Sequence, residues 1–328
     1  MTTPIWQRGA TAPIHIDFEA AFGVTNTSKS PVLLPYNSCD LAGSQELVTP
    51  ETITGTRNPV PPFAGKIDVA GNLVVPLDCT IFGHLLRWMF GAPSSSGTTN
   101  YTHIYKVGLT QPSCTVERIF TDLTRYALYN GVMVKSATIE IQATGELTCR
   151  LALLGASRAD SGTATLTTPA TPTLARLQGR QVAIYEGAAQ SFSALPYGTK
   201  LTINIDFGLD GETYVIAGGG QRRYMAPGIV SVSGTLSGLF EDAALLTKAT
   251  DLTETGLKAT IAIGANNALE IVIPELHFEE KTPAVTGNKG VLLELNYKAF
   301  VADDSDATPI KVTLKNQTAG ATYGYIAP

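Results

Sequence analysis

The chain is short of charge, and none of its charges cluster. Charged residues make up 16% of its 328 residues, against about 25% in average proteins. The net charge is −5, and no run of basic residues is longer than the pair Arg222-Arg223. Tight binding of nucleic-acid phosphates needs clustered cations. The composition therefore argues against a nucleic-acid-binding protein. It does not argue against a protein past which nucleic acid moves without being bound. So sparse a surface charge also hints that much of the surface is covered in an assembly.

Residues that carry catalysis or hold metals are scarce. The four histidines, His15, His84, His103 and His277, lie too far apart for metal-ligand spacing. The glycine-rich run Gly218–Arg223 lacks the Lys-Ser/Thr of a phosphate-binding loop, and a flexible subunit-contact loop is the better interpretation. No nucleophile elbow and no cysteine–histidine pair of a known catalytic spacing is present. We therefore predict a protein that is not an enzyme and has no cofactor or metal.

Cysteine and targeting signals are equally sparse. The N-terminal residues lack the basic and apolar regions of a signal peptide. No apolar run approaches the roughly 20 residues of a membrane helix, so we expect no membrane association. The cysteines have no CxxC spacing and all lie in the first half: Cys39, Cys79, Cys114 and Cys149. Free, mostly buried thiols in a reducing compartment are the expected state.

What the sequence does contain is a repeat of almost half its length. Six residues recur 163 positions later: Ile53, Gly55, Gly65, Val69, Gly71 and Leu73 become Ile216, Gly218, Gly228, Val232, Gly234 and Leu236. Six identities over Thr52–Asp78 exceed the roughly one or two expected by chance. The tripeptide Leu34–Tyr36 also returns, as Leu195–Tyr197. These matches predict a duplicated domain.

Hydrophobic periodicity predicts strands and one short helix in each copy. Lys66–Leu77 alternates like a strand, and a helix with apolar residues between Ile81 and Met89 follows until Gly91. Val132–Ile141 and Glu146–Leu154 are predicted strands joined by a turn. Tyr101–Lys106 and Ser113–Phe120 are predicted to pair as a hairpin, and Ser94–Asn100 is predicted to be a flexible loop.

The second copy repeats this pattern. Its clearest strands are Lys200–Phe207 and Val291–Phe300, with a helix of about a dozen residues from Glu241. The predicted organisation is a first domain over residues 1–160 with an N-terminal arm that could reach a neighbouring subunit, a linker over 161–175, and a second domain with a C-terminal tail over 176–328. The predicted fold class is mainly β: two tandem β-sandwich or barrel domains, each with one short flanking α-helix.

Several of these stretches resemble the long-form tail tube protein of long-tailed bacteriophages. In the first half the similar stretches are LLPYNSCDLAGSQELVTPETITGTRNP, DVAGNLVVPLD, IFGHLLRWMFGAP and YTHIYK. In the second half they are LTINIDF, YVIAGGGQRR and SVSGTLSGLFED. The similarity extends from about Phe18 to Phe300, and its motifs are structural rather than catalytic.

The resemblance implies a tube domain whose inner strands join those of neighbours into a closed barrel. Rings of this kind stack into the hollow tail tube of the virion, which conducts DNA at ejection. The implied partners are further copies of the chain, a tape-measure protein, a tail terminator, baseplate or tail-tip proteins and passing double-stranded DNA, with assembly in the host cytoplasm. Single-domain members form hexameric rings, so the duplication predicts a trimer with pseudo-sixfold symmetry.

Candidate site residues follow from this architecture. Polar strand positions are the candidates for the lumen surface: Glu140, Gln142, Glu146, Glu294 and Asn296. Flexible segments are the candidates for contacts between rings or subunits: Asn58, Pro59, Pro61, Pro62, Phe63, Gly218, Gly219, Gly220, Arg222 and Arg223.

Two other functions stay open from the sequence. One is a carbohydrate- or receptor-binding β-sandwich of the virion, which would favour aromatic clusters on loops. The other is the tube of a contractile tail or a secretion system, which is built from the same domain.

Overall fold

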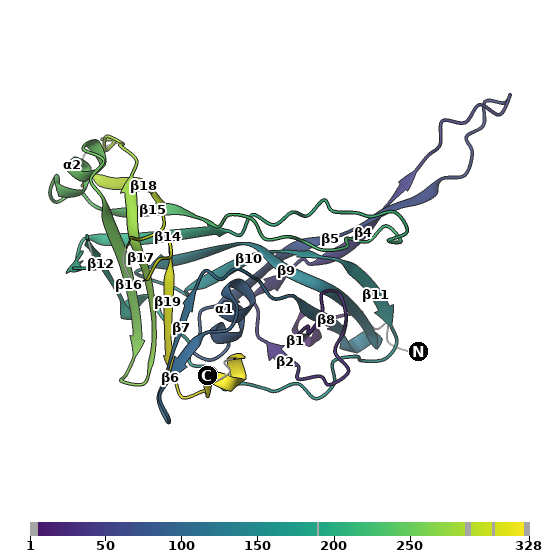
Figure 1. The fold of residues 1–328 in the computed structure, drawn as a ribbon, viewed down its shortest axis with the longest axis horizontal. Coiled ribbons are helices and arrows are strands. Elements are labelled where there is room, and N and C mark those ends of the chain that lie inside the picture. Colours follow the sequence, from purple (N-terminus) through teal and green to yellow (C-terminus); the bar gives the residue numbers. More distant parts are fainter. Residues whose placement is uncertain (1–5, 189, 286–289, 304–305, 325–328) are drawn as a thin grey trace.

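The chain is mainly β, with long antiparallel strands and two short α-helices (Figure 1). The computed structural model describes residues 6–188, 190–285, 290–303 and 306–324. Residues 1–5 of the predicted N-terminal arm and 325–328 of the predicted tail lie outside the described residues. The predicted fold class is confirmed, and the predicted domain boundaries stay a prediction.

The first half is a sandwich of two sheets. The inner sheet contains β3 (Ser38–Cys39), β4 (Ala42–Val48), β5 (Phe63–Pro76), β10 (Thr148–Gly155) and the C-terminal part of β9 (Arg125–Gln142). The outer sheet contains β2 (Val32–Leu34), β1 (Ile14–Phe18), β8 (Cys114–Phe120), the N-terminal part of β9 and β11 (Ser157–Ser161). Alternating apolar residues of both sheets fill the space between them. The predicted strands over Lys66–Leu77, Val132–Ile141 and Glu146–Leu154 are confirmed.

Helix α1 (Phe82–Phe90) is buried in this core, as its apolar spacing predicts. Before it, the Asp78 carboxylate accepts hydrogen bonds from the backbone N–H of Thr80 (2.6 Å) and Ile81 (2.9 Å). The helix ends at Gly91, whose φ of 90° disfavours side chains with a Cβ. Inside the core, the indole N–H of Trp88 donates to the Val132 carbonyl (2.9 Å) and so ties the helix to β9.

The second half repeats the pairing scheme of the first. Its strands are β12 (Val182–Gly187), β13 (Ser193–Ala194), β14 (Gly198–Asp206), β15 (Ser231–Leu239), β16 (Thr255–Ile263), β17 (Asn267–Phe278), β18 (Leu292–Ala299) and β19 (Lys311–Asn316). Helix α2 (Ala244–Thr250) is shorter than the predicted dozen residues. Its end is fixed just beyond Asp251, because Leu252 takes a left-handed φ of 49°.

The two halves share strand pairing in two places. β14 pairs with β9, and β19 pairs with β7 (Tyr101–Lys106). The predicted hairpin of Tyr101–Lys106 with Ser113–Phe120 is therefore wrong: β7 pairs with β6 (Ser94–Ser96) and β19, whereas β8 pairs with β1 and β9. Periodicity identifies a strand but not its partner, and here the partner lies some two hundred residues away. β6 also gives the predicted loop Ser94–Asn100 a short strand.

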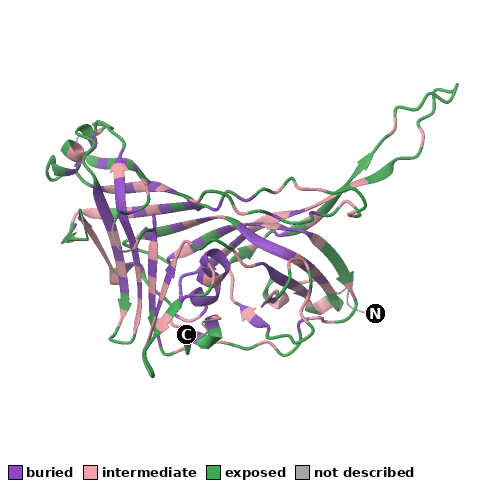
Figure 2. Ribbon diagram, in the orientation of Figure 1, coloured by how far each residue is buried: buried purple, intermediate pink, exposed green. Residues whose placement is uncertain are grey.

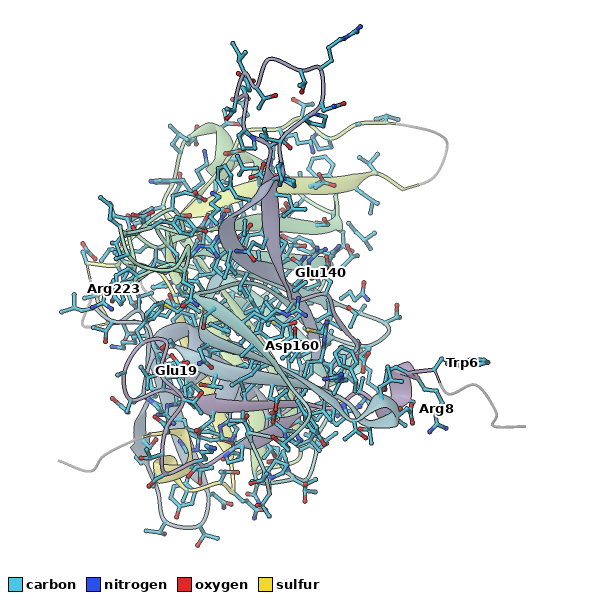
Figure 3. The ribbon with its side chains drawn as sticks, turned by 90° about the vertical axis from the view of Figure 1, so that its right-hand side faces the viewer. Trp6, Arg8, Glu19, Glu140, Asp160 and Arg223 are labelled. Carbon is cyan, nitrogen blue, oxygen red and sulfur yellow. The ribbon has the colours of Figure 1, made fainter. Side chains whose placement is uncertain are left out.

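The N-terminal segment is more integrated than an arm. Strand β1 is buried between β2 and β8, so Ile14–Phe18 does not reach toward a neighbour. The residues just before it lie over the outer sheet, where Arg8 forms an ion pair with Asp122 (2.9 Å). Trp6 and Arg8 mark this end of the chain, which projects from the body (Figure 3). The described residues also form short 3₁₀ helices: η1 (Gly9–Thr11), η2 (Thr121–Leu123), η3 (Gly179–Gln181) and η4 (Gly320–Tyr323).

The predicted linker is held against the first half. The buried Glu117 carboxylate accepts backbone hydrogen bonds from Thr165 (2.6 Å) and Leu166 (2.8 Å). The backbone N–H of Leu33 donates to the Ala170 carbonyl (3.0 Å). The linker thus runs as an extended strap along the outer sheet.

The most exposed feature is a hairpin that leaves the body between β4 and β5 (Figures 1 and 2). We call residues 49–62, which join the paired residues Val48 and Phe63, the hairpin arm. Almost all of its residues are exposed. A segment with so little packing of its own is among the least stable parts of a fold.

Candidate assembly surface

One polar face extends across the inner sheets of both halves. Because side chains alternate along a strand, Ile139 and Ile203 point into the core, whereas their neighbours Thr138 and Asn204 point outward. The strand order β4–β5–β10–β9–β14–β15–β18 is continuous, so these outward residues form a single surface. Figure 2 shows the mixed exposure along these strands.

The structure places four of the five predicted lumen residues along this sheet. Glu140 on β9 lies 3.8 Å from Lys200 on β14 and is labelled in Figure 3. Gln142 lies opposite Lys200 at the end of the same ladder. Glu294 and Asn296 are exposed on β18, where the Asn296 carboxamide oxygen accepts a hydrogen bond from the Thr235 hydroxyl (3.1 Å).

Glu146 lies elsewhere. It precedes β10, at the end of the sheet, and its carboxylate binds Arg176 (2.9 Å) and the Asn37 side chain (2.7 Å). These contacts tie the β9–β10 turn to the segments before β3 and after the linker. Its position is at the rim of the polar face.

Cations on the same face balance the predicted anions. Lys281 pairs with Glu294 (2.9 Å), and Lys298 pairs with Glu279 (3.1 Å). Hydrogen bonds from Lys298 and then Asn296 lower the pKa of the Glu279 carboxyl, because they favour its charged form. Sequence reasoning missed these lysines, although the alternation that selected Glu294 and Asn296 also selects Lys298. Lys281 and Lys298 are thus each paired with a carboxylate on this face.

The hairpin arm contains most of the first set of predicted contact residues. Asn58, Pro59, Pro61 and Pro62 are exposed along it, and Phe63, at the start of β5, is 56% exposed. Ile53 at 95% exposure is an apolar contact candidate that was not selected, although it belongs to the internal repeat. An exposed arm that carries Ile53 and leads into the exposed Phe63 suits a contact with another subunit.

The second predicted contact segment lies beside the base of the arm. The Gly220 carbonyl accepts a hydrogen bond from the backbone N–H of Ile67 on β5 (2.8 Å). Gly219 and Gly220 have φ of 62° and 75°, which glycine adopts without strain. Two segments about 160 residues apart are thus brought together, with Arg223 exposed on the surface (Figure 3).

Arg222 has a different place from its neighbour Arg223. It is only 5% exposed, and its guanidinium donates to the carbonyls of Gly211 (2.5 Å), Gly155 (2.9 Å) and Val69 (3.1 Å). It also forms an ion pair with Asp68. These contacts lie within the chain and fix residues Gly218–Arg223, which we call the glycine loop, on β5. Arg222 therefore positions this loop.

The histidines and potential metal ligands of the described residues lie apart from these surfaces or from one another. Among the described residues, no group of three or more His, Cys, Asp or Glu side chains is placed to hold a metal ion. His84 is buried in α1, and desolvation lowers its pKa to about 4, so it is neutral at pH 7. No helix in the described part of the chain has the length and apolarity to span a bilayer.

Comparison with known proteins shows a family match. A family model described as phage tail tube protein matches residues 9–299. The matched region includes both copies of the repeat, the hairpin arm and the glycine loop. No curated protein matches the chain.

Proposed function

Because this chain belongs to the phage tail tube protein family, we propose that it polymerises as stacked rings into the hollow tail tube of a long-tailed phage. The role is structural and non-enzymatic. DNA leaves the capsid through the tube, which surrounds a tape-measure protein before ejection. A tail terminator and tail-tip or baseplate proteins close its two ends, and the parts assemble in the host cytoplasm.

The observation that carries this proposal is the edge-to-edge joining of two equivalent sheets. β9 of the first half pairs with β14 of the second half without a gap in the ladder. Each chain would contribute eight strands, the seven of the order given above and residues 279–281 beside β18, so three chains joined in the same way would close a barrel of about 24 strands. At a spacing of about 4.8 Å and a tilt of about 40°, its backbone diameter is roughly 50 Å. The proposed ring is therefore a trimer with pseudo-sixfold symmetry.

The polar face is the proposed lumen surface, with Glu140, Gln142, Glu294 and Asn296 on it and Glu146 at its rim. DNA carries about one negative charge per 1.7 Å of its axis, so a basic lumen would hold it by many phosphate contacts. On the proposed lumen surface, Lys200, Lys281 and Lys298 are each paired with a carboxylate, which reduces the free positive charge that the phosphates would meet. The hairpin arm and the glycine loop are the proposed contacts between stacked rings.

Electron microscopy of the purified protein tests the proposal. Negative-stain images should show hollow rings or tubes, and native mass measurement should give three copies per ring. Six copies per ring would overturn the trimer. Stable monomers under every condition, together with glycan binding on an array, would instead favour the receptor-binding function.

The arm has a separate test. Replacing residues 49–62 with Asn-Gly, a favoured two-residue hairpin turn, should leave rings intact and abolish their stacking. Tubes of normal length from this variant would remove the arm from the inter-ring contact.

The lumen assignment is tested by charge reversal. Phage that carry Glu140→Lys and Glu294→Lys should assemble tubes but eject DNA more slowly. Glu254→Lys, a reversal outside the polar face, is the control. Normal ejection by the double variant would remove both residues from the lumen.

A further inference from the structure

The internal repeat extends to the register of individual strand pairs. Leu73 on β5 pairs with Leu151 on β10, and 163 positions later Leu236 on β15 pairs with Leu295 on β18. The edge strands obey the same rule, because β3 pairs with β5 where β14 pairs with β15. Each strand of one inner sheet therefore has a defined counterpart in the other.

One junction has no counterpart within the chain. The β9·β14 junction joins the last inner strand of the first copy to the first inner strand of the second copy. Its counterpart joins the segment after β17 to the outer edge of β3 and β4. These lie at opposite ends of one sheet, so a single chain cannot bring them together. Among the described residues, no strand pairs with the outer side of β3 or β4.

We infer that residues 279–285 pair with the β3–β4 edge of a second copy in one defined antiparallel register, with Glu279 opposite the second copy's Ser44. This inference rests on the proposed function, because it specifies how the proposed ring closes. It assigns the strands, their register and one ion pair.

Ser44 is fixed as the counterpart of Asp206. Asp206 on β14 pairs with Ser231 on β15, and Ser44 on β4 pairs with Asp68 on β5. Ser231 and Asp68 are 163 positions apart, as the repeat requires. The junction inside the chain places Asp206 opposite Ser136.

Glu279 is fixed as the counterpart of Ser136. Ser136 pairs with Ala152 on β10, which holds the position of Asn296 on β18. Although β17 ends at Phe278, the backbone N–H of Glu279 still donates to the Asn296 carbonyl (2.8 Å). The Lys281–Glu294 ion pair (2.9 Å) continues the same register along β18. Residues 279–281 are thus aligned as a strand, and no strand among the described residues pairs with their other side.

The backbone groups of both segments agree with this register. In an antiparallel strand, alternate residues direct N–H and C=O to opposite sides. The backbone N–H of Asp40 donates to the Asn72 carbonyl on β5 (3.0 Å). Leu41 and Gly43 therefore direct their N–H and C=O groups outward, away from β5. The backbone N–H of Glu279 donates to β18, so Glu280 and Thr282 direct their N–H and C=O groups outward, away from β18. In the inferred register, Glu280 lies opposite Gly43 and Thr282 lies opposite Leu41, so backbone groups that point outward face each other. A shift of one residue would place outward-pointing backbone groups opposite inward-pointing ones.

Pro283 is compatible with this arrangement. It has no N–H, and by the same alternation that missing donor would face β18 rather than the second copy. Its carbonyl likewise points away from the interface. The proline therefore removes no hydrogen bond between copies.

A charge pair supports the same alignment. Arg158 on β11 covers the core side of Gly43, where a Cβ would meet the Arg158 Cδ at 2.7 Å. Its guanidinium donates to the Gly43 carbonyl (3.0 Å), which retains a second lone pair. Glu280, exposed in the free chain, comes opposite Gly43 on that side. Its carboxylate therefore meets the second copy's Arg158, which in the free chain binds Asp160 (2.7 Å).

A cross-link tests the register directly. Ala42 and Lys281 are opposite each other in a non-hydrogen-bonded pair, where Cα atoms lie about 4.5 Å apart and a disulfide can form. Oxidised rings of the Ala42→Cys/Lys281→Cys variant should run as covalent trimers on a non-reducing gel. Thr138→Cys/Asn204→Cys, at the equivalent positions inside the chain, is the matched positive control. Each single Ala42→Cys or Lys281→Cys variant is the negative control.

The outcomes separate this inference from the proposed function. Rings seen in the microscope that do not cross-link through 42 and 281, while the 138/204 control oxidises, would overturn the register and leave the tube function standing. Cross-linking through Ala42→Cys/Glu279→Cys instead would also overturn it. Absence of rings and tubes under every condition would remove the function and this inference with it.

The ion pair is tested by charge reversal. Glu280→Arg should raise the protein concentration needed for ring formation by about tenfold, because it sets two cations against each other. Adding Arg158→Glu should restore assembly. Unchanged assembly by Glu280→Arg would exclude the Glu280–Arg158 contact.

Discussion

The two helices occupy the same position in the repeat and differ in almost every contact. Helix α1 lies inside the first half, against β7, β9 and η4, and eight of its nine residues are buried. Helix α2 lies at the outer end of the second half, against β17, with Leu245 and Ala249 as its buried residues. Met89 is 1% exposed, whereas Leu252, 163 positions later, is 65% exposed.

This difference shows what the duplication retained. The inner strands keep their pairing partners and register in both copies, as the proposed ring with equivalent edges would require. The helices are free of that requirement. The first copy uses its helix to fill a core, whereas the helix of the second copy buries only Leu245 and Ala249. Stability should therefore depend strongly on α1 and weakly on α2.

The largest expected effect is at Trp88. Trp88→Ala removes a fully buried side chain and its hydrogen bond to the Val132 carbonyl. Urea unfolding of the unassembled protein should show a loss of about 3–5 kcal/mol in the free energy of unfolding. A loss below about 1 kcal/mol would mean that α1 is no more important to the core than α2.

Acid should lower the free energy of unfolding through His84 on α1, and α2 has no corresponding histidine. The folded-state pKa of His84 is about 4, below the unfolded value of 6.5, so the unfolded chain binds more protons between these values. The free energy of unfolding therefore falls as the pH drops from 6.5 to 4, by roughly 2–3 kcal/mol from this group.

The matched variants isolate this term. Stability measured across that pH range should fall less in His84→Gln than in the wild type, because the buried imidazole is absent. Thr247→His places a histidine at the exposed equivalent position on α2 and should add no pH dependence. Parallel pH profiles for the wild type and His84→Gln would contradict the assignment.

Leu245 is the strongest anchor of α2. It is 3% exposed, and Leu245→Ala should cost about 2–3 kcal/mol in the same unfolding measurement. A cost equal to that of Trp88→Ala would contradict the difference between the helices.

The smallest effect is expected at Leu252. Leu252→Ala should change the free energy of unfolding by less than about 0.5 kcal/mol, because the side chain is already exposed. Met89→Ala at the equivalent position of α1 should cost about 2–5 kcal/mol. Similar losses for the two variants would show that the helices are equivalent after all.

Local features of the fold could be predicted from the sequence. The alternation in Lys66–Leu77 and the helical spacing around Leu85 depend on neighbouring residues, and both elements occur as predicted. The partner of β7 could not be predicted, because β19 lies some two hundred residues further along the chain. The shorter α2 depends on a left-handed Leu252, which its residue type does not indicate.

The candidate surface shows the same division. Alternation correctly indicated that Glu140 and Glu294 point away from the core, since facing is a local property. It gave no sign that Arg222 is buried beneath β5 while Arg223 is exposed. That distinction depends on Asp68 and on carbonyls from three other segments, which only the folded chain brings together.

The β7·β19 pairing sets the order in which the protein can be completed during translation. The last strand seals the first half: the Asn316 side chain donates to the Cys79 carbonyl (2.6 Å), and the Tyr323 hydroxyl donates to the Thr80 carbonyl (2.7 Å). Domains usually fold from the N-terminus as the ribosome releases them. β7, Cys79 and Thr80 therefore gain these partners only after the residues of β19 and η4 have been released. A chain truncated before β19 lacks these contacts and leaves the first half incomplete.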